Sequence, residues 1–578
     1  MASVVQRRAR KRRYVVVLGM VAAMALSAAP AIAVEPEQPQ LISFQTDQEP
    51  MLDALVAGGT VEAIVTVGEQ LGSIMFEAIP DGISVIRRQP GTIDMLINHE
   101  MSTVPFPYST PPSASNLNDF SDSLVSNLRL KISNRNVIRA RYVINDGQNF
   151  HRFCSNFLPG SGHGFDRRIL LTNEEGTDWV NRDGLQWPAT VGADNARQIG
   201  LVVARDLLSG ETRPIWGMGR HNHENSVALK GYGHPVVLSG DDTFLTNPPH
   251  SQVYSYIANS ATDLFNDQGT LYGFVSDDPA VNDYYDFPPG SPMSVSGHFI
   301  PVPKEIATGR NPDGTDMMAA DVPASLGGPY PAPVAGDMTN AAGTTTPVDG
   351  PQWVLEHWSD LNNVFQFVRI EDMAYDKRNG MANVMYMADS GRGSATPPGP
   401  GVSTNGRIWK LVMDPNDPTV VTSLSILIEG DDSPVKTVTE VRQPDNLETT
   451  KRGLFITEDP GSSQQFASGD PLGVNARVWQ YKFTDSSLTP VLAVDQSADE
   501  GPTDVDAPTT PGNMGAWEAS GIIDVSKFFG KGYFLVDVQA HTLFTHTQPG
   551  PDIAAPAGPD WTYKREGGQL LLVHIPGG

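Results

Sequence analysis

Acidic residues recur where short apolar runs of this chain end. Each run is β-branched or aromatic and is followed by one or two acids and then by a loop. The acids in these positions are Glu100, Glu175, Asp242, Asp389, Glu458 and Asp459. One such acid alone more often hydrates a surface turn. Six of them at one shared cavity would repel one another unless cations neutralise them, so the repetition predicts a metal site. Oxygen ligands suit Ca²⁺ and harder transition ions.

Arg369 stands beside two further acids, in Arg369-Ile370-Glu371-Asp372. In a strand, Arg369 and Glu371 face one side and Asp372 faces the other. A guanidinium beside metal-binding carboxylates is what a phosphate site requires, because metals polarise the phosphoryl oxygens and the guanidinium neutralises the remaining charge. The alternative interpretation is an ion pair between Arg369 and its neighbours.

Two other stretches are rich in potential ligands. Residues 219–226 include His223 and Glu224 just before an apolar run, and Pro444-Asp445-Asn446 precedes Thr457-Glu458-Asp459-Pro460. Imidazole and carboxylate groups can both bind metals, and a histidine can also transfer protons. His223 is therefore a candidate for proton delivery to a leaving group, with a metal-bound water as the alternative.

Cys154 is the single cysteine of the chain, which excludes a disulfide framework, a zinc finger and a cluster bound by several cysteines. A cysteine with apolar neighbours is usually a buried structural thiol. As a ligand, its thiolate would favour iron, copper or zinc over calcium. The sequence contains no Gly-x-Ser-x-Gly, His-Glu-x-x-His or Gly-Lys-Ser/Thr phosphate loop, so serine-hydrolase and nucleotide-hydrolase functions have no direct support.

The elements that must position these residues are short strands repeated at a long interval. The acids that end them are separated by 75 (100 to 175), 67 (175 to 242), 70 (389 to 459) and 78 (459 to 537) residues, and the gap of 147 from 242 to 389 is about two such intervals. Repeats of this kind are typical of propellers with one unit per blade. We predict an all-β fold, a β-propeller of about six blades with long decorating loops. A pair of β-sandwiches is the alternative, but it would not explain the recurring acids.

The composition narrows the possible partners. The chain has 578 residues, 39% of them apolar, and a formal net charge of −26. Nucleic acids and anionic membranes need patches of Lys and Arg, so we expect neither as a partner. No stretch after the N-terminal region reaches the roughly 18 apolar residues of a membrane span. We expect a soluble monomer that acts on a small molecule.

The N-terminus predicts export. Residues 1–33 have a basic start, an apolar run from Tyr14 to Leu26, and Ala31-Ile32-Ala33, which a signal peptidase would cut. Arg12-Arg13 also fits a weak twin-arginine signal, and an ordinary secretory signal explains the same residues equally well. Residues 34–578 are then one propeller domain in the periplasm or outside the cell.

In their order along the chain, the motifs resemble those of the PhoX-type alkaline phosphatases and their uncharacterised secreted relatives. The resemblance runs over about residues 90 to 545 and rests on Asn98-His99-Glu100, Cys154, Thr172-Asn173-Glu174-Glu175, Gly219-Arg220, His223-Glu224-Asn225, Arg369-Ile370-Glu371-Asp372, Asp445-Asn446, Thr457-Glu458-Asp459-Pro460, Trp517-Glu518-Ala519-Ser520-Gly521-Ile522 and Asp537-Val538-Gln539-Ala540-His541. It implies a β-propeller enzyme, exported by the twin-arginine route, with iron and calcium in its channel.

The resemblance also implies roles for individual residues. Arg369 would hold the substrate phosphate. The residues that would bind iron are Cys154, Glu224, Glu371 and Asp372. The candidates for calcium are Glu174, Glu175, Asp445, Glu458 and Asp459.

The leading hypothesis is a metal-dependent phosphatase, a hydrolase of phosphoric monoesters. Arg369 and the cations would clamp the phosphate, and an oxygen activated by the ions would attack phosphorus. One alternative is a calcium-dependent esterase or lactonase in which Arg369 only pairs internally. Another is a non-enzymatic module that calcium stabilises and that binds partners through its long loops.

Overall fold

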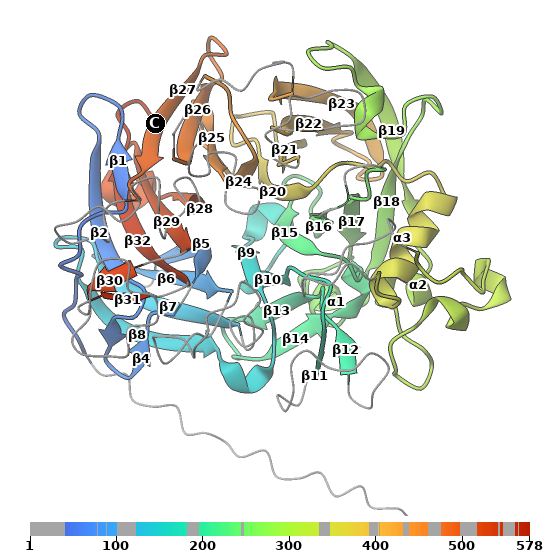
Figure 1. Cartoon of the computed structure of the whole chain (residues 1–578), viewed down its shortest axis with the longest axis horizontal. Helices are drawn as coiled ribbons and strands as arrows, with labels where there is room; N and C mark the ends of the chain where they lie inside the picture. The colour runs from blue at the N-terminus through green and yellow to red at the C-terminus, as the bar shows by residue number, and fades with distance from the viewer. Residues whose placement is uncertain are drawn as a thin grey trace, which may run out of the picture. The chain divides into compact units, whose positions relative to one another are not determined.

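The strands of the described residues form six antiparallel blades around one axis, so the predicted all-β propeller is confirmed (Figure 1). This computed structural model describes the chain from residue 41 to residue 578 apart from several gaps. Those gaps are residues 78, 88, 101–122, 182–195, 244, 246–247, 335–346, 392–402, 404, 432–438, 460–474, 497–516, 542–543, 547–560 and 564–565. The expected signal peptide, with its Arg12-Arg13 pair, lies outside the described residues.

Each blade has four strands, which follow one another from the axis outward. Blade 1 contains β5 (Pro80–Arg87), β6 (Thr92–His99), β7 (Leu124–Lys131) and β8 (Val137–Ile144). Blade 2 contains β9 (Phe153–Phe157), β10 (Ile169–Glu174), β13 (Val202–Asp206) and β14 (Thr212–Ile215). Blade 3 contains β15 (His223–Ala228), β16 (Val236–Asp241), β17 (Val253–Ile257) and β18 (Thr270–Ser276).

The second half of the ring repeats this arrangement. Blade 4 contains β20 (Ile370–Tyr375), β21 (Val384–Asp389), β22 (Arg407–Met413) and β23 (Val420–Glu429). Blade 5 contains β24 (Pro444–Thr449), β25 (Gly453–Glu458), β26 (Arg477–Lys482) and β27 (Leu488–Val494). Blade 6 contains β28 (Glu518–Asp524), β29 (Tyr533–His541), β32 (Glu566–His574) and β2 (Thr60–Thr66).

Shorter elements decorate the blades. The additional strands are β1 (Leu52–Ala54), which extends blade 5, β3 (Gln70–Leu71), β4 (Ile74–Met75), β11 (Trp179–Asn181), β12 (Ala196–Gln198), β19 (Ser294–Pro301), β30 (Phe544–His546) and β31 (Trp561–Tyr563). The helices are α1 (Ala261–Phe265), α2 (Lys304–Thr308), α3 (Pro351–Leu361) and α4 (Ser526–Phe529). β19 pairs with both β18 and β23, so it joins blades 3 and 4 into one continuous sheet.

The start of the chain closes the ring. β2 pairs with β32 from the other end of the chain, with Thr60 opposite His574 and Thr66 opposite Gln569. Blade 6 therefore takes its outermost strand from the N-terminal part of the chain. This pairing fixes the two ends of the described region to one sheet and leaves the last blade with four strands like the others.

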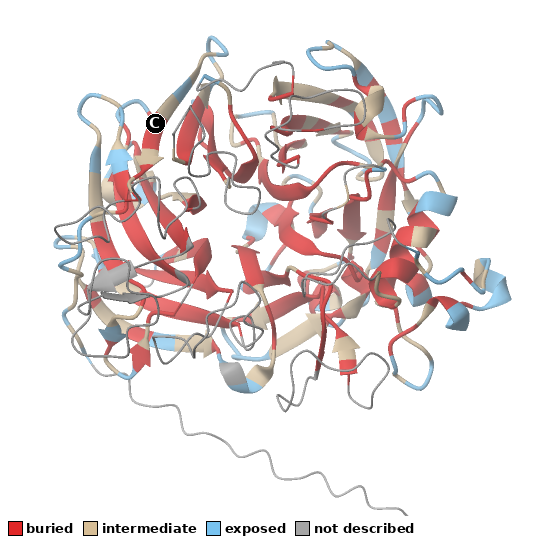
Figure 2. Cartoon of the chain, viewed as in Figure 1, coloured by how far each residue is buried: buried red, intermediate tan, exposed pale blue. Residues whose placement is uncertain are grey.

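Burial follows from the position of each strand in its blade. The innermost strands are buried along most of their length, whereas strands at the rim mix buried, intermediate and exposed residues (Figure 2). In β19, which lies between β18 and β23, Val295 and Phe299 are buried while Ser294 and His298 are exposed, as expected for an antiparallel strand with one face on the core. Six clusters of buried apolar side chains stabilise the ring, and each includes side chains from two neighbouring blades.

Consecutive innermost strands contact one another around the whole axis: β5, β9, β15, β20, β24 and β28, which returns to β5. Some of these contacts leave no room for a side chain. A Cβ atom on Gly82 would lie 2.2 Å from the backbone nitrogen of Asn156 in the next blade. No helix in the described part of the chain is long and apolar enough to cross a membrane.

We expect Gly82→Ala to destabilise the protein by about 1–3 kcal/mol, because the added methyl group forces blades 1 and 2 apart. The measurement is the shift of the thermal unfolding midpoint. Gly160→Ala is the matched control, since a Cβ there meets nothing within 4 Å and the backbone φ is −122°. Equal shifts for the two variants would contradict this account of blade packing.

Candidate metal centre

All six innermost strands lose regular pairing with the second strand of their blade near their N-terminal end. Two residues of the inner strand there stand opposite one residue of its partner, as in a β-bulge. A bulge re-aims the side chains within it. The first residues of the six bulges are Asp81, Cys154, Glu224, Glu371, Asp445 and Ser520.

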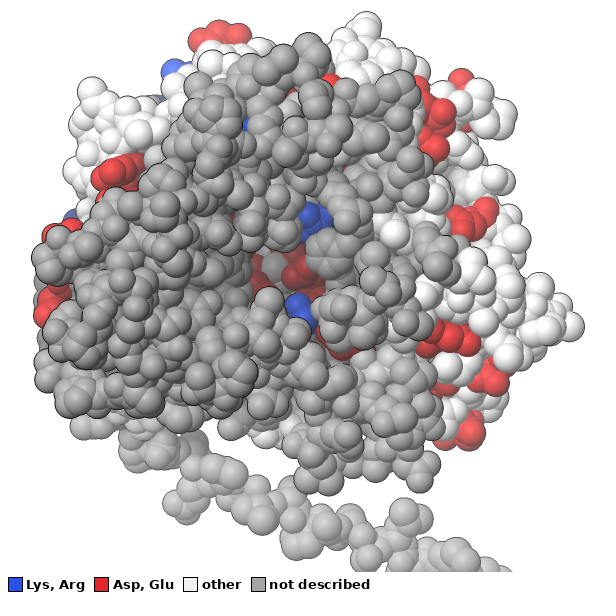
Figure 3. Space-filling model, in the orientation of Figure 1, with Lys and Arg blue, Asp and Glu red and all other residues white. Residues whose placement is uncertain are grey.

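A second ring of residues comes from the carboxyl ends of the second strands: five members directly follow the last residue of the strand, and the sixth lies within β29. By the same register, its members are Glu100, Glu175, Asp242, Ser390, Asp459 and Gln539. Glu175 and Asp242 are close enough to hydrogen-bond, and so are Asp459 and Glu518. Acidic side chains are visible in the opening near the centre of Figure 3, with basic side chains at its edge. The two rings, together with Glu518 beside Asp459, form one largely buried group of carboxylates, which we call the carboxylate cluster.

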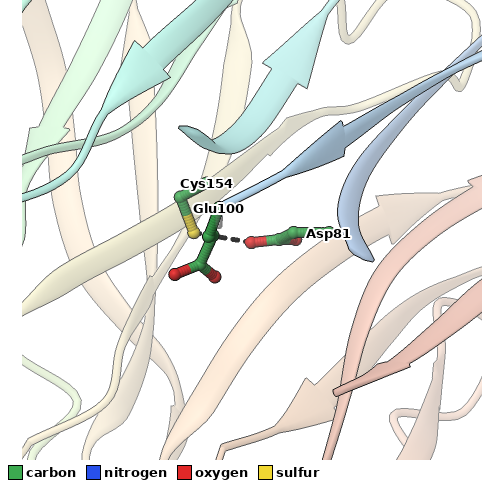
Figure 4. Close-up of side chains that lie close together, drawn as sticks. All are labelled: Asp81, Glu100 and Cys154. Carbon is green, nitrogen blue, oxygen red and sulfur yellow. Dashed lines mark hydrogen bonds between the residues drawn. The ribbon is translucent and has the colours of Figure 1, made fainter. Parts of the chain in front are cut away.

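Cys154 lies where two triads of potential ligands meet. The ligand atoms of Asp81, Glu100 and Cys154 all lie within 4.8 Å of one another, and so do those of Cys154, Glu175 and Glu224. Figure 4 shows the first triad, in which the Cys154 thiol donates to Asp81 Oδ2 at 2.6 Å. One thiolate and four carboxylates could therefore ligate neighbouring metal ions.

The cluster strongly disfavours its own ionised form. Burial, and then the charges of Glu100 and Glu371, raise the pKa of Glu175 to about 8. Burial raises the pKa of Glu224 well above its ordinary value, and the charges of Glu175 and other acids add to this. The pKa of the Cys154 thiol is raised well above its ordinary value by burial and by its acidic neighbours. Bound cations would remove this penalty, because they favour the ionised forms.

Arg369 lies within the cluster and is oriented by two acids. Its Nε and Nη2 donate to the two oxygens of Asp242 at 2.8 and 3.0 Å, and Nη2 lies 2.8 Å from Glu371 Oε1. Burial acts to lower the pKa of Arg369, but the charges of Asp242 and Glu371 outweigh it and raise the pKa well above its ordinary value. The backbone φ of Arg369 is 109°, a conformation that costs a non-glycine residue about 1–3 kcal/mol.

The first acid of each strand-end pair has a different task. Glu174 Oε1 accepts from the backbone N–H of His151, and Asp389 Oδ2 accepts from that of Val368. Glu458 accepts from the backbone N–H groups of residues 442 and 477 and from Trp479 Nε1. These carboxylates hold the loops that lead into the innermost strands. The expected ligands Glu174 and Glu458 are thus engaged with the backbone, and their neighbours Glu175 and Asp459 contribute to the cluster.

A hydrogen-bonded layer closes the cluster on one side. Asp372 accepts from Asn225 Nδ2 in blade 3 and from the Leu447 backbone N–H in blade 5. Asn446 Nδ2 donates to Ser155 Oγ, at 3.0 Å, across blades 5 and 2. Beyond this layer the channel continues as a cavity of about 160 Å³ lined by all six innermost strands. Asp372 bridges three blades through these hydrogen bonds, and its expected role as an iron ligand stays a prediction.

The structure brings together most of the residues expected from the sequence. The expected site residues in the cluster are Cys154, Glu175, Glu224, Arg369, Glu371, Asp445 and Asp459. His223 lies apart from them, with Nδ1 bonded to Ser239 Oγ at 2.7 Å and Nε2 to the Gly219 carbonyl at 3.2 Å. Burial lowers the pKa of His223 to about 3. This geometry gives His223 a packing role in blade 3.

Sequence reasoning missed two members of the cluster. Asp81 stands at the start of a strand and so carries no strand-end signal, but Pro80-Asp81-Gly82 resembles Pro444-Asp445-Asn446, and comparison of the two would have revealed it. Glu518 lies in a motif whose residue types alone assign it no role. Burial raises the pKa of Glu518 well above the ordinary value, and the charge of Asp459 raises it further.

Comparisons with known proteins give the chain no family. No family model matches the sequence, and no curated protein matches it. Eighteen chains of solved structures match. One of these is the computationally designed Ika8 protein, which is 7% identical, has a TM-score of 0.23, and is matched over 73% of this chain and 80% of its own.

In metal-free protein, Glu224→Gln should raise the unfolding midpoint at pH 8, because it removes a buried acid that folding keeps protonated. The substituted amide retains an acceptor for Ser155 Oγ, which now donates to Glu224 at 3.0 Å. Glu458→Gln should lower the midpoint, since one amide group cannot accept from all three donors. Thermal unfolding after chelation measures both. A fall for both variants would contradict the distinction between cluster and backbone-holding acids.

Metal-free protein should also lose stability as the pH rises from about 5 to 8. The pKa values of Glu175 and Asp242 are about 8 in the folded chain and about 4 in an unfolded chain. The folded state therefore binds more protons in this window, and each group lowers the free energy of unfolding by up to about 1.4 kcal/mol per pH unit. Denaturant unfolding at several pH values, with and without Ca²⁺, is the measurement. A slope that Ca²⁺ leaves unchanged would contradict cation binding by these acids.

Proposed function

We propose that the protein is an exported, metal-dependent phosphatase that hydrolyses small phosphoric monoesters. The observation that carries this proposal is the position of the Arg369 guanidinium within a buried cluster of carboxylates and one thiol. Such a cluster can hold cations, and cations beside a guanidinium form a site for a doubly charged phosphate. The order of the sequence motifs, similar to those of PhoX-type phosphatases, supports the same activity.

The donor set fits the metals that this activity needs. The Cys154 thiol with Glu224 and Glu175 offers the sulfur and oxygen ligands that suit iron. The other carboxylates offer only oxygen and suit calcium; they include Asp81, Glu371, Asp445, Asp459 and Glu518. The raised pKa values support cation binding, because burial of so many ionised acids without counter-charge would be strongly unfavourable. When bound, the ions would polarise the phosphoryl oxygens and promote ionisation of water.

Arg369 would bind the phosphate by exchanging partners. Its guanidinium now makes two parallel hydrogen bonds to Asp242, and a phosphate offers the same pair of acceptor oxygens. Glu371 is held in turn by Ser390 Oγ, which donates to its Oε1 at 2.6 Å. The strained backbone at residue 369 and the contact with Glu371 would keep the guanidinium oriented when a phosphate replaces Asp242. A donor that is already oriented stabilises developing negative charge with little reorganisation.

Proton transfer is better assigned to acids of the cluster than to His223. Both nitrogens of His223 are bonded within blade 3. Asp242 bonds Arg369, and Glu175 is within hydrogen-bonding distance of Asp242. A pKa of about 8 lets each acid hold a carboxyl proton near neutral pH. A group with such a pKa is suited to protonate a leaving alkoxide.

Arg369→Lys should reduce the turnover of an aryl phosphate about 100-fold while the bound metal is retained, because a lysine cannot make the paired hydrogen bonds. Phosphate release and metal analysis on the same preparation are the measurements. Arg378→Lys is the control: Arg378 bonds Asp376 in the same blade. Activity that survives complete removal of metal would refute the proposal. Turnover of carboxylic esters alone would favour an esterase. Absence of turnover with every ester tested would favour a binding module.

A further inference from the structure

A second group of potential metal ligands lies outside the channel, where α3 packs on blade 3. Glu356 and Asp360 are four residues apart in α3 and therefore lie on one face of the helix. His250 precedes β17 and meets them from the neighbouring loop. One ligand atom from each of these three side chains lies within 4.8 Å of the other two.

Their geometry is close to that of a metal site. His250 Nδ1 and Glu356 Oε1 are 2.8 Å apart, and both side chains are more than nine-tenths buried. Ligand atoms around a tetrahedral ion at about 2.1 Å lie about 3.4 Å apart. Only a small outward movement of these two atoms would therefore admit an ion. Asp360 is exposed and completes the triad from the solvent side.

The surroundings provide second contacts and space for water. Gln252 Nε2 donates to Glu356 Oε2 at 2.6 Å, which fixes the carboxylate. Gln366 Nε2 lies 3.3 Å from Asp360 Oδ1. His250, Asp360 and Gln366 line a cavity of about 170 Å³ that could hold the remaining ligands of an ion. Ligating side chains that are themselves hydrogen-bonded are typical of metal sites.

Charge also favours a cation at this position. The charge of Glu356 acts on the buried Asp241, and the charges of Glu356, Asp241 and Asp360 all act on the hydroxyl of Tyr254. His250 is the one basic side chain in the triad. An imidazole with two carboxylates and open water positions is a typical zinc donor set, whereas calcium takes oxygen ligands. We infer that His250, Glu356 and Asp360 bind one divalent transition cation of the zinc class.

An ion here would stabilise the segment that positions Arg369. The Ser251 carbonyl accepts from the Phe367 backbone N–H at 2.6 Å, and Ser251 Oγ accepts from that of Ile370 at 2.9 Å. Residues 367 and 370 flank Arg369. A cation held by His250 would thus anchor the residue next to Ser251. Cation binding itself does not depend on the proposed phosphatase activity.

The test is metal stoichiometry and stability of the full chain, stripped with a chelator and then titrated with Zn²⁺. His250→Ala and Asp360→Asn should each bind one equivalent less than the wild type and lose part of the rise in unfolding midpoint that Zn²⁺ produces. His298→Ala is the control, because His298 makes a comparable 2.9 Å contact with Asp277 but belongs to no such triad among the residues that the structure describes.

Failure at the two sites can be told apart. Glu224→Gln should change binding at the carboxylate cluster and leave the equivalent that depends on His250. If His250→Ala does not fold, Asp360→Asn still decides, since Asp360 is exposed. Unchanged zinc stoichiometry in Asp360→Asn would overturn the inference and leave His250 and Glu356 as an ion pair. Absence of phosphatase activity in every preparation would contradict the proposed function but not the inferred zinc site.

Discussion

Mutual repulsion among buried carboxylates is the constraint on which this architecture depends. Six blades converge on one axis, and five of the six bulges point a carboxylate or a thiol toward it. Isolated charges of one sign in such a place would drive the inner strands apart. In the structure, the pKa values of cluster acids such as Glu224 and Asp445 are raised. Hydrogen bonds from the backbone to Asp389 and Glu458 hold the loops in place. Cations would therefore stabilise the ionised cluster. When no cation is bound, the surrounding strands must hold the acids together against their repulsion.

The two acids at a strand end have different roles: one holds the backbone of a loop, and the other joins the cluster. Glu458 accepts three N–H donors and so holds the loop before β24, while Asp459 follows it into the cluster. In blade 1, His99 takes the position of Glu458 and bonds the Glu77 carbonyl instead. A position that supports the backbone can therefore change chemical type from blade to blade, provided that a bond to the loop is kept. At a position in the cluster, by contrast, a different residue type changes the charge of the site.

The sequence was sufficient to predict the ring and much of its contents. The long interval between acids predicted six blades, and alternation predicted that Arg369 and Glu371 share a side, as their 2.8 Å contact bears out. The bulges set the limit of such reasoning, because one extra residue in each inner strand moves the register in a way that the pattern does not reveal. The interval that ends at Asp537 is an example. The register places Gln539, two residues later, in the ring, whereas Asp537 lies opposite the bulge.

Departures from sixfold repetition give the site its direction. In blade 4 the ring position holds Ser390 instead of an acid, and Ser390 donates to Glu371. The ring position of blade 4 therefore offers Arg369 no carboxylate, since Asp389 before it binds the Val368 backbone, and Arg369 reaches across to Asp242 of blade 3. The position two residues before each bulge varies equally, with arginine at 152 and 369, glutamine at 443 and glutamate at 518. A symmetric ring of acids could only hold ions. Because the guanidinium of blade 4 extends to Asp242 of blade 3, the ring carries a cationic donor beside its carboxylates, and this asymmetry is what the proposed chemistry on a phosphate would use.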